Sequence, residues 1–66
     1  MREYIIIRTS SGYINTFSPD KIDFTKVKDE AVLFPYDITK EEKIGIFELL
    51  VDKYDICEFV CEIVII

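Results

Sequence analysis

The sequence predicts an α+β fold, in which a small and mainly antiparallel sheet carries one main helix packed on one face, in the order β-β-(β)-α-β. Three observations predict it. Residues 56–66 alternate with a period of two, residues 3–17 form two β-rich runs around a tight turn, and residues 40–54 repeat apolar side chains every three or four positions. A chain of 66 residues builds one small core, so we expect a single domain over residues 1–66.

The C-terminal segment reads ICEFVCEIVII, and its parity predicts its structure. The odd-numbered residues are all apolar, whereas the even-numbered ones mix acids with aliphatic side chains. A period of two with one uniformly apolar side is typical of a strand whose apolar side faces the core. The residues expected in the core are Cys57, Phe59, Cys61, Ile63 and Ile65.

The strand interpretation also predicts the state of the two cysteines. On a strand, Cys57 and Cys61 lie about 13 Å apart on one side, too far for a disulfide, and we expect both to be buried and reduced. On a helix they would share a face as two metal ligands. The chain has no histidine and no third cysteine to complete a zinc site, so we expect no metal and no cofactor.

The N-terminal segment predicts a β-hairpin. The runs EYIIIRT and GYINTF are rich in β-branched and aromatic residues, and Gly12 between them supplies the positive φ of a tight turn. The first run is apolar on both sides, which is typical of a strand inside a sheet. We expect the C-terminal strand beside it.

Residues 18–38 carry weaker patterns. Ile22 and Phe24 alternate with polar residues, which favours a short third strand near residues 21–25. The following run KVKDEAVLF predicts one helical turn that places Ala31 and Phe34 inward, and Pro35 ends it.

A helix is predicted over residues 40–54. Thr39 and Glu42 have the spacing of a capping box. The apolar stripe expected to pack on the sheet is Ile44, Phe47, Leu50, Val51 and Tyr54. A single helix covers one face of the sheet, so the other face needs residues 18–38 or a second subunit.

Composition excludes several classes of function. The net charge of −5 opposes binding to nucleic acid and to an anionic membrane surface. Neither end has an apolar run as long as a secretory signal or a membrane helix, so we expect a cytoplasmic protein. A basic protein is the partner that suits this charge, although acidic residues also serve solubility.

No catalytic constellation is recognisable, so we expect a protein that is not an enzyme. The chain has no histidine, Ser10 and Ser11 have no evident base, and two glycines cannot form a phosphate-binding loop. A catalytic or ligand-binding role would need a well-formed concave pocket.

The predicted helix presents an acidic face opposite its apolar stripe. Carboxylates near a helix C-terminus oppose the dipole, and a glycine costs about 1 kcal/mol relative to alanine inside a helix. Such local costs indicate a binding surface, with ordinary surface solvation as the alternative. The residues of this acidic face are Glu41, Gly45, Glu48, Asp52 and Asp55.

An apolar surface is the second candidate. The helix has apolar residues beside its stripe, and the last strand has them on its even-numbered side. They predict a homodimer or a hydrophobic partner groove, or else they belong to the core. These residues are Ile46, Leu49, Val60 and Val64.

The segments YIIIRTSSGYINTF, FTKVKDEAVLF and ICEFVCEIVII resemble the small uncharacterised proteins encoded by phages and prophages of low-GC Gram-positive bacteria. The isoleucine, lysine, aspartate and tyrosine content also suits an AT-rich genome. The resemblance implies a class of role: many such acidic proteins bind and block a host protein, including defence nucleases with basic active surfaces. It implies no chemistry and assigns no site residues.

The leading hypothesis is therefore a non-enzymatic phage or mobile-element protein that binds and inhibits or modulates a host protein through the acidic helix face. The alternative is a structural or oligomeric accessory protein that associates through its apolar surface.

Overall fold

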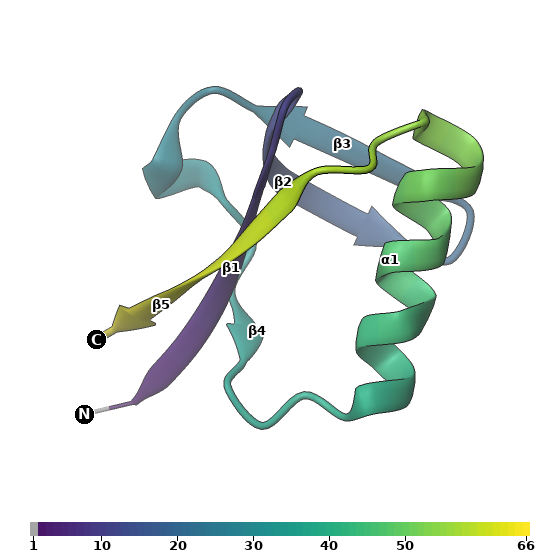
Figure 1. Ribbon diagram of the computed structural model, residues 1–66. Helices are drawn as coiled ribbons and strands as arrows, with labels where there is room; N and C mark the ends of the chain where they lie inside the picture. The colour runs from purple at the N-terminus through teal and green to yellow at the C-terminus, as the bar shows by residue number, and fades with distance from the viewer. Residues whose placement is uncertain (1) are drawn as a thin grey trace.

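The computed structural model describes residues 2–66 and confirms the α+β class: they form a five-stranded, mostly antiparallel sheet and one main helix (Figure 1). The predicted third strand forms over its expected residues, and the helix has the predicted bounds. One short strand was not predicted. The elements are β1 (Glu3–Thr9), β2 (Gly12–Ser18), β3 (Lys21–Thr25), a 3-10 turn η1 (Lys28–Glu30), β4 (Phe34–Pro35), α1 (Lys40–Tyr54) and β5 (Phe59–Ile65).

Strand β1 lies at the centre of the sheet. Along one edge it pairs antiparallel with β5 over its whole length, from Glu3 opposite Ile65 to Thr9 opposite Phe59, as predicted. Its other edge is shared, because β2 pairs with its C-terminal end and β4 pairs beside Ile5. Strand β3 extends the sheet beyond β2.

The β1–β2 turn depends on Gly12, whose φ of 114° is the positive value that the sequence predicts. A Cβ atom at this position would lie 2.5 Å from the backbone oxygen of Thr25 on β3. Thr9 supports the turn, because its Oγ1 donates to the Gly12 carbonyl at 2.8 Å. Glycine is therefore required by both backbone conformation and space.

The core lies between the sheet and α1. Both faces of β1 are buried, as expected for an interior strand. The segment around η1 covers the face opposite α1, where Ala31 is buried as predicted and a hollow lies between Ile6 and Val64. The core side chains on the helix side are Ile7, Ile14, Ile22, Ile46, Leu50 and Ile56.

The prediction that the odd-numbered side of β5 is buried is wrong. Ile63 is 60% exposed and Ile65 is 59% exposed, and both cysteines are exposed. This side does face the same way as buried Ile7, its neighbour across the strand pair from Cys61. The helix, however, packs on β1, β2 and β3, and only Phe59 of β5 reaches it.

The predicted buried stripe of α1 is rotated in the structure. Ile44 and Val51 are 43% and 42% exposed, whereas Ile46 is buried at 3%. Ile46 packs in the core with Ile14 and Ile22 of the β2–β3 hairpin. Leu50, Phe47 and Tyr54 keep their predicted inward positions.

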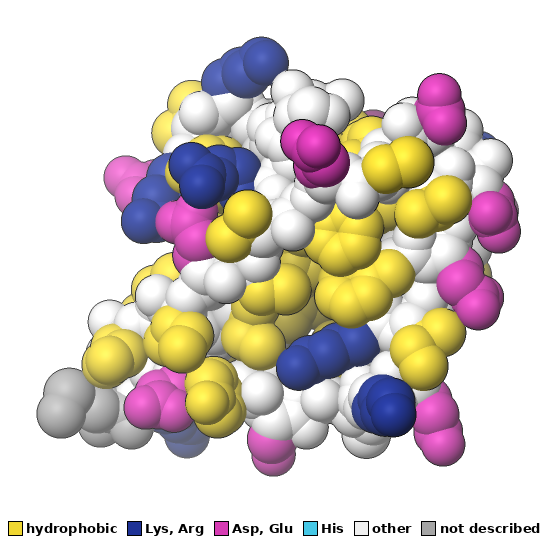
Figure 2. Space-filling model, in the orientation of Figure 1, with side chains coloured by type: hydrophobic (Ala, Val, Ile, Leu, Met, Phe, Trp, Pro, Cys, Tyr) yellow, Lys and Arg dark blue, Asp and Glu magenta, His cyan; other side chains and the backbone are white. Residues whose placement is uncertain are grey.

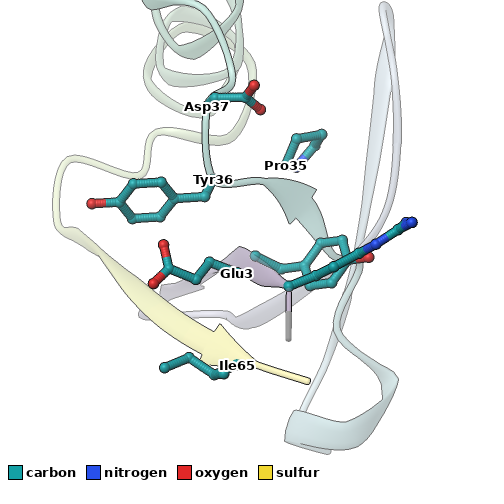
Figure 3. Close-up of a pocket in the computed structure, with 7 residues that line it drawn as sticks. Glu3, Pro35, Tyr36, Asp37 and Ile65 are labelled. Carbon is teal, nitrogen blue, oxygen red and sulfur yellow. The ribbon is translucent and has the colours of Figure 1, made fainter.

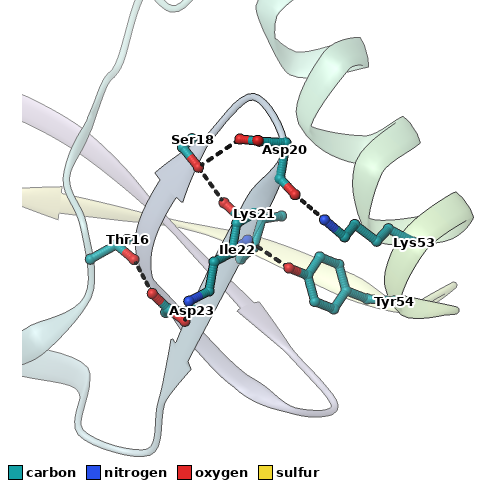
Figure 4. A network of polar contacts seen from close by, with 8 residues as sticks. All are labelled: Thr16, Ser18, Asp20, Lys21, Ile22, Asp23, Lys53 and Tyr54. Atoms are coloured by element: carbon teal, nitrogen blue, oxygen red, sulfur yellow. Dashed lines mark hydrogen bonds and ion pairs between the residues drawn. The ribbon is translucent and has the colours of Figure 1, made fainter.

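A polar network ties the end of α1 to the β2–β3 hairpin (Figure 4). The Ile22 N–H donates to the Tyr54 hydroxyl at 2.7 Å, and the ring of Tyr54 packs edge-on against Phe24. Lys53 donates to the Asp20 carbonyl in the turn. These contacts fix the rotation of α1 about its own axis.

We expect Tyr54→Phe to lower the free energy of unfolding by about 1–3 kcal/mol, because the partly buried Ile22 N–H loses its acceptor. Thermal unfolding would show a fall of about 4–8 °C per kcal/mol for a domain of this size. Tyr36→Phe is the control, since Tyr36 is half exposed. Equal melting temperatures for Tyr54→Phe and the wild type would contradict this role.

Candidate protein-binding surface

The five predicted residues of the acidic face all lie exposed on α1. At 100° per residue they share the side of the helix opposite Leu50. From Glu41 to Asp55 they span about 21 Å along the axis, at 1.5 Å per residue. Figure 2 shows acidic side chains along the outer edge of the molecule, over α1.

Charges on α1 are segregated. Lys53 donates to a backbone carbonyl of the β2–β3 turn, and Lys43 is half buried. Among residues 2–66, the ion pairs are Arg8–Glu62, Lys21–Asp23 and Lys28–Glu62. None of them involves a carboxylate of the acidic face, so its negative charge is free to attract a cationic partner.

The start of α1 is capped as predicted: Thr39 Oγ1 accepts from the Glu42 N–H at 3.2 Å. Its end is less favourable. Asp55 adopts the left-handed conformation with φ of 54°, while the Ile56 N–H donates to the Leu50 carbonyl at 3.0 Å. This arrangement usually takes glycine or asparagine at the position of Asp55. The acidic face thus carries a third local cost, which the sequence did not reveal.

Gly45 has no steric reason to be glycine. A Cβ atom there would meet nothing within 4 Å, and the residue has no positive φ. It lies at the border between the acidic face and an apolar hollow of about 460 Å³. The residues that line the hollow are Phe17, Pro19, Phe34, Pro35, Ile38, Glu42, Gly45 and Ile46.

Of the residues predicted for a homodimer or a hydrophobic partner groove, Ile46 lines this hollow, and the rest of the lining was not predicted. Its floor is an edge-to-face pair, Phe17 and Phe34, with ring centroids 6.2 Å apart. Phe34 is held there by β4, the strand too short to be recognised from the sequence. The hollow and the acidic face together form a surface with an apolar side and a charged side.

The residues predicted for an apolar association surface separate in the structure. Ile46 is buried, and Leu49 packs against the core. Val64 is half buried beside the η1 segment, so only Val60 is freely exposed. One group of exposed apolar side chains lies instead on β5 and α1, and Figure 2 shows apolar side chains gathered between these two elements. They are Ile44, Val51, Cys61, Ile63 and Ile65, next to the stacked rings of Phe47 and Phe59.

A second hollow, of about 630 Å³, opens beside the paired ends of β1, β4 and β5 (Figure 3). Glu3, Tyr36 and Asp37 line it and are all exposed. In Figure 3 the carboxylates of Glu3 and Asp37 point away from one another.

Within residues 2–66, no three Cys, Asp or Glu side chains come together as metal ligands. No helix in this part of the chain is long and apolar enough to cross a membrane. Comparison with protein-family models, with curated proteins and with solved structures gives no match to this chain.

Asp55→Gly should raise the free energy of unfolding by about 1 kcal/mol, because glycine adopts the left-handed conformation without strain and removes a charge that opposes the helix dipole. Chemical denaturation would measure the change. Asp52→Gly is the matched control: it removes the same charge but should destabilise, since Asp52 lies inside the helix. A loss of stability in Asp55→Gly would contradict the strain at this position.

Proposed function

We propose that this chain is a non-enzymatic phage or mobile-element protein that binds a host protein and inhibits or modulates it. The acidic face of α1 is the contact surface. The target has a basic surface, as nucleic-acid-binding and defence proteins do. The resemblance of the sequence to small phage and prophage proteins supports the origin, and the charge on α1 supports the mode of binding.

The observation that carries this proposal is the position of Gly45. It stands in the middle of four carboxylates, at the rim of an apolar hollow, with empty space where a side chain would be. A helix pays about 1 kcal/mol for glycine at such a position. A partner that approaches the backbone here gains acids for its cations and the hollow for one apolar side chain.

The spacing of the carboxylates suits a target that binds phosphates. Glu48, Asp52 and Asp55 follow one another at roughly 6 and 4.5 Å along the axis. On the basic surface of the target, these carboxylates would take the positions that the phosphates of a nucleic acid otherwise occupy. Charge attraction of this kind accelerates association and weakens with salt.

The first test is capture of host proteins from a Gram-positive bacterial lysate by the tagged chain, at about 0.05 M and about 0.5 M salt. We expect one basic protein to be retained at low salt and released at high salt. The double substitution Glu48→Lys, Asp52→Lys should weaken its binding more than tenfold, because two attractive charges become repulsive.

The matched control is Asp29→Lys, Asp37→Lys, which changes the net charge equally at two exposed acids away from the acidic face. It should retain the same target. Equal loss in both double variants would show that only net charge matters, and equal retention in both would refute the acidic face as the contact surface.

Gly45→Ala separates stability from binding. The added methyl group meets no atom of this chain, so alanine should raise the free energy of unfolding by about 1 kcal/mol. The same methyl group should lower the affinity for the captured target at least tenfold if the partner approaches the backbone there. Denaturation and titration with the purified target measure the two effects. A stabilised variant with unchanged affinity would contradict the close approach.

The alternative function is that of an oligomeric accessory protein, and the uncovered apolar side chains on β5 favour it. Association through them would depend little on salt. Leu49 is unsuitable as a probe of this alternative, because it packs against the core and a charge there would damage the fold. Exposed Ile63 is the cleaner position.

A further inference from the structure

We propose that two copies of this chain associate through β5, whose free edges pair antiparallel about a twofold axis at Cys61 and join the two sheets into one. Strand β5 is seven residues long and pairs only with β1 among residues 2–66. Its other edge is therefore open. A long, apolar and unprotected edge is a template for another strand.

The backbone of β5 shows which residues face the open edge. The Arg2 N–H donates to the Ile66 carbonyl at 2.8 Å, and the Ile66 N–H donates to the Arg2 carbonyl at 2.9 Å. In an antiparallel pair, such mutually bonded residues alternate with residues whose backbone groups point to the opposite edge. The odd-numbered residues of β5 therefore present their N–H and carbonyl groups outward: Phe59, Cys61, Ile63 and Ile65.

Nothing along β5 discourages pairing. The strand has no proline, no lysine and no register shift against β1. Its one charged residue, Glu62, lies between Arg8 at 3.4 Å and Lys28 at 3.6 Å. Arg8 lacks hydrogen-bond alignment with the Glu62 Oε2 atom, so charge attraction holds this pair. Although the whole chain is acidic, this edge is locally neutralised and can approach its own copy.

The register of the pairing is set by the residue at the twofold axis, and each choice of this central residue places different side chains opposite one another. A centre at Glu62 would place that carboxylate opposite its own copy, which is unfavourable. A centre at Ile63 would end the ladder where Cys61 meets Ile65. A centre at Cys61 pairs Phe59 with Ile63, which is the same number of positions within β5. It keeps the acids of the two copies from facing one another, and it gives the longer ladder if residues 57 and 58, which precede β5, pair with the partner as far as Ile65; we choose it for that reason.

A second copy fits this edge because the edge is self-complementary. The twofold axis is perpendicular to the sheet, so each α1 lies on the same face of the joined sheet. The exposed odd-numbered side chains of both β5 strands then form one apolar strip between the two helices. Each apolar cross-strand pair contributes favourably to the association.

Sedimentation of the untagged chain tests the association. We expect a concentration-dependent dimer for the wild type. Ile63→Lys should weaken it at least tenfold, since each copy places a charge at the joined edge. The control is Ile44→Lys, the same change at an isoleucine on α1 that is 43% exposed, against 60% for Ile63, and that lies outside β5. A wild type that stays monomeric at all concentrations would overturn the proposal, as would dissociation by Ile44→Lys alone, which indicates packing through the sheet face.

Disulfide trapping tests the register. Residues opposite one another in a mutually bonded pair have Cα atoms about 5.5 Å apart, within the range of a disulfide. Diamide takes the two electrons and two protons released as the thiols join. Cys57→Ser should form the covalent dimer through Cys61, and Cys61→Ser should not. Crosslinking through Cys57 alone would refute the centre at Cys61.

Amide hydrogen exchange tests the edge itself without any substitution. In a monomer, the N–H groups of Cys61, Ile63 and Ile65 face solvent, whereas those of Glu62 and Val64 are bonded to β1. Dimerisation should slow exchange at the odd-numbered residues, increasingly with concentration. Fast exchange there in a sedimenting dimer would show another interface. The acidic face of α1 takes no part in this pairing, so failure of the capture experiment leaves it unaffected.

Discussion

Strand β1 needs hydrogen-bonding partners along both of its edges and apolar cover on both of its faces. Most of the other elements supply one of these. Strand β5 fills one edge over its whole length, and β2 and β4 divide the other. Helix α1 covers the side of Ile7, and the segment around η1 covers the side of Ile6. A run of three isoleucines in a chain this small can be buried only if the rest of the molecule surrounds it.

The unequal cover of the sheet accounts for both exposed surfaces. Tyr54 and Lys53 hold α1 over the β2–β3 hairpin, which leaves β5 without a helix above it. The apolar side of β5 and the flank of α1 around Val51 are exposed for that reason. The acidic face points in the opposite direction from the core, so the two surfaces can be used independently. A charged partner and a second copy of the chain would not compete for the same residues.

Local sequence patterns predicted the helix and most of the strands. The errors concern which side chains are buried, because burial depends on segments far away in the sequence. The bounds of α1 follow from its capping box and apolar repeat, the turn from the glycine at position 12, and the pairing of the first and last strands from apolar residues on both of their sides. All of these are local properties. The alternation of residues in β5 also predicts which of its sides faces the same way as the core. It does not show whether the helix extends far enough to cover that side. The rotation of α1 was missed because it depends on contacts between distant residues, such as that of Tyr54 with Ile22, 32 positions apart. The acidic face was visible in the sequence, whereas the hollow beside Gly45 depends on β4, whose two residues carry no pattern.

The pairing of β1 with β5 also sets the order in which the fold can be completed. The partners in this ladder lie at opposite ends of the 66 residues, so the longest strand pair is also the one that closes the largest loop. Before β5 has been synthesised, the β1–β2 hairpin and α1 can form, but one edge of β1 lacks its partner strand. The sheet is completed only when β5 has been synthesised and pairs with β1, and the nascent chain is most vulnerable to misassembly in that interval.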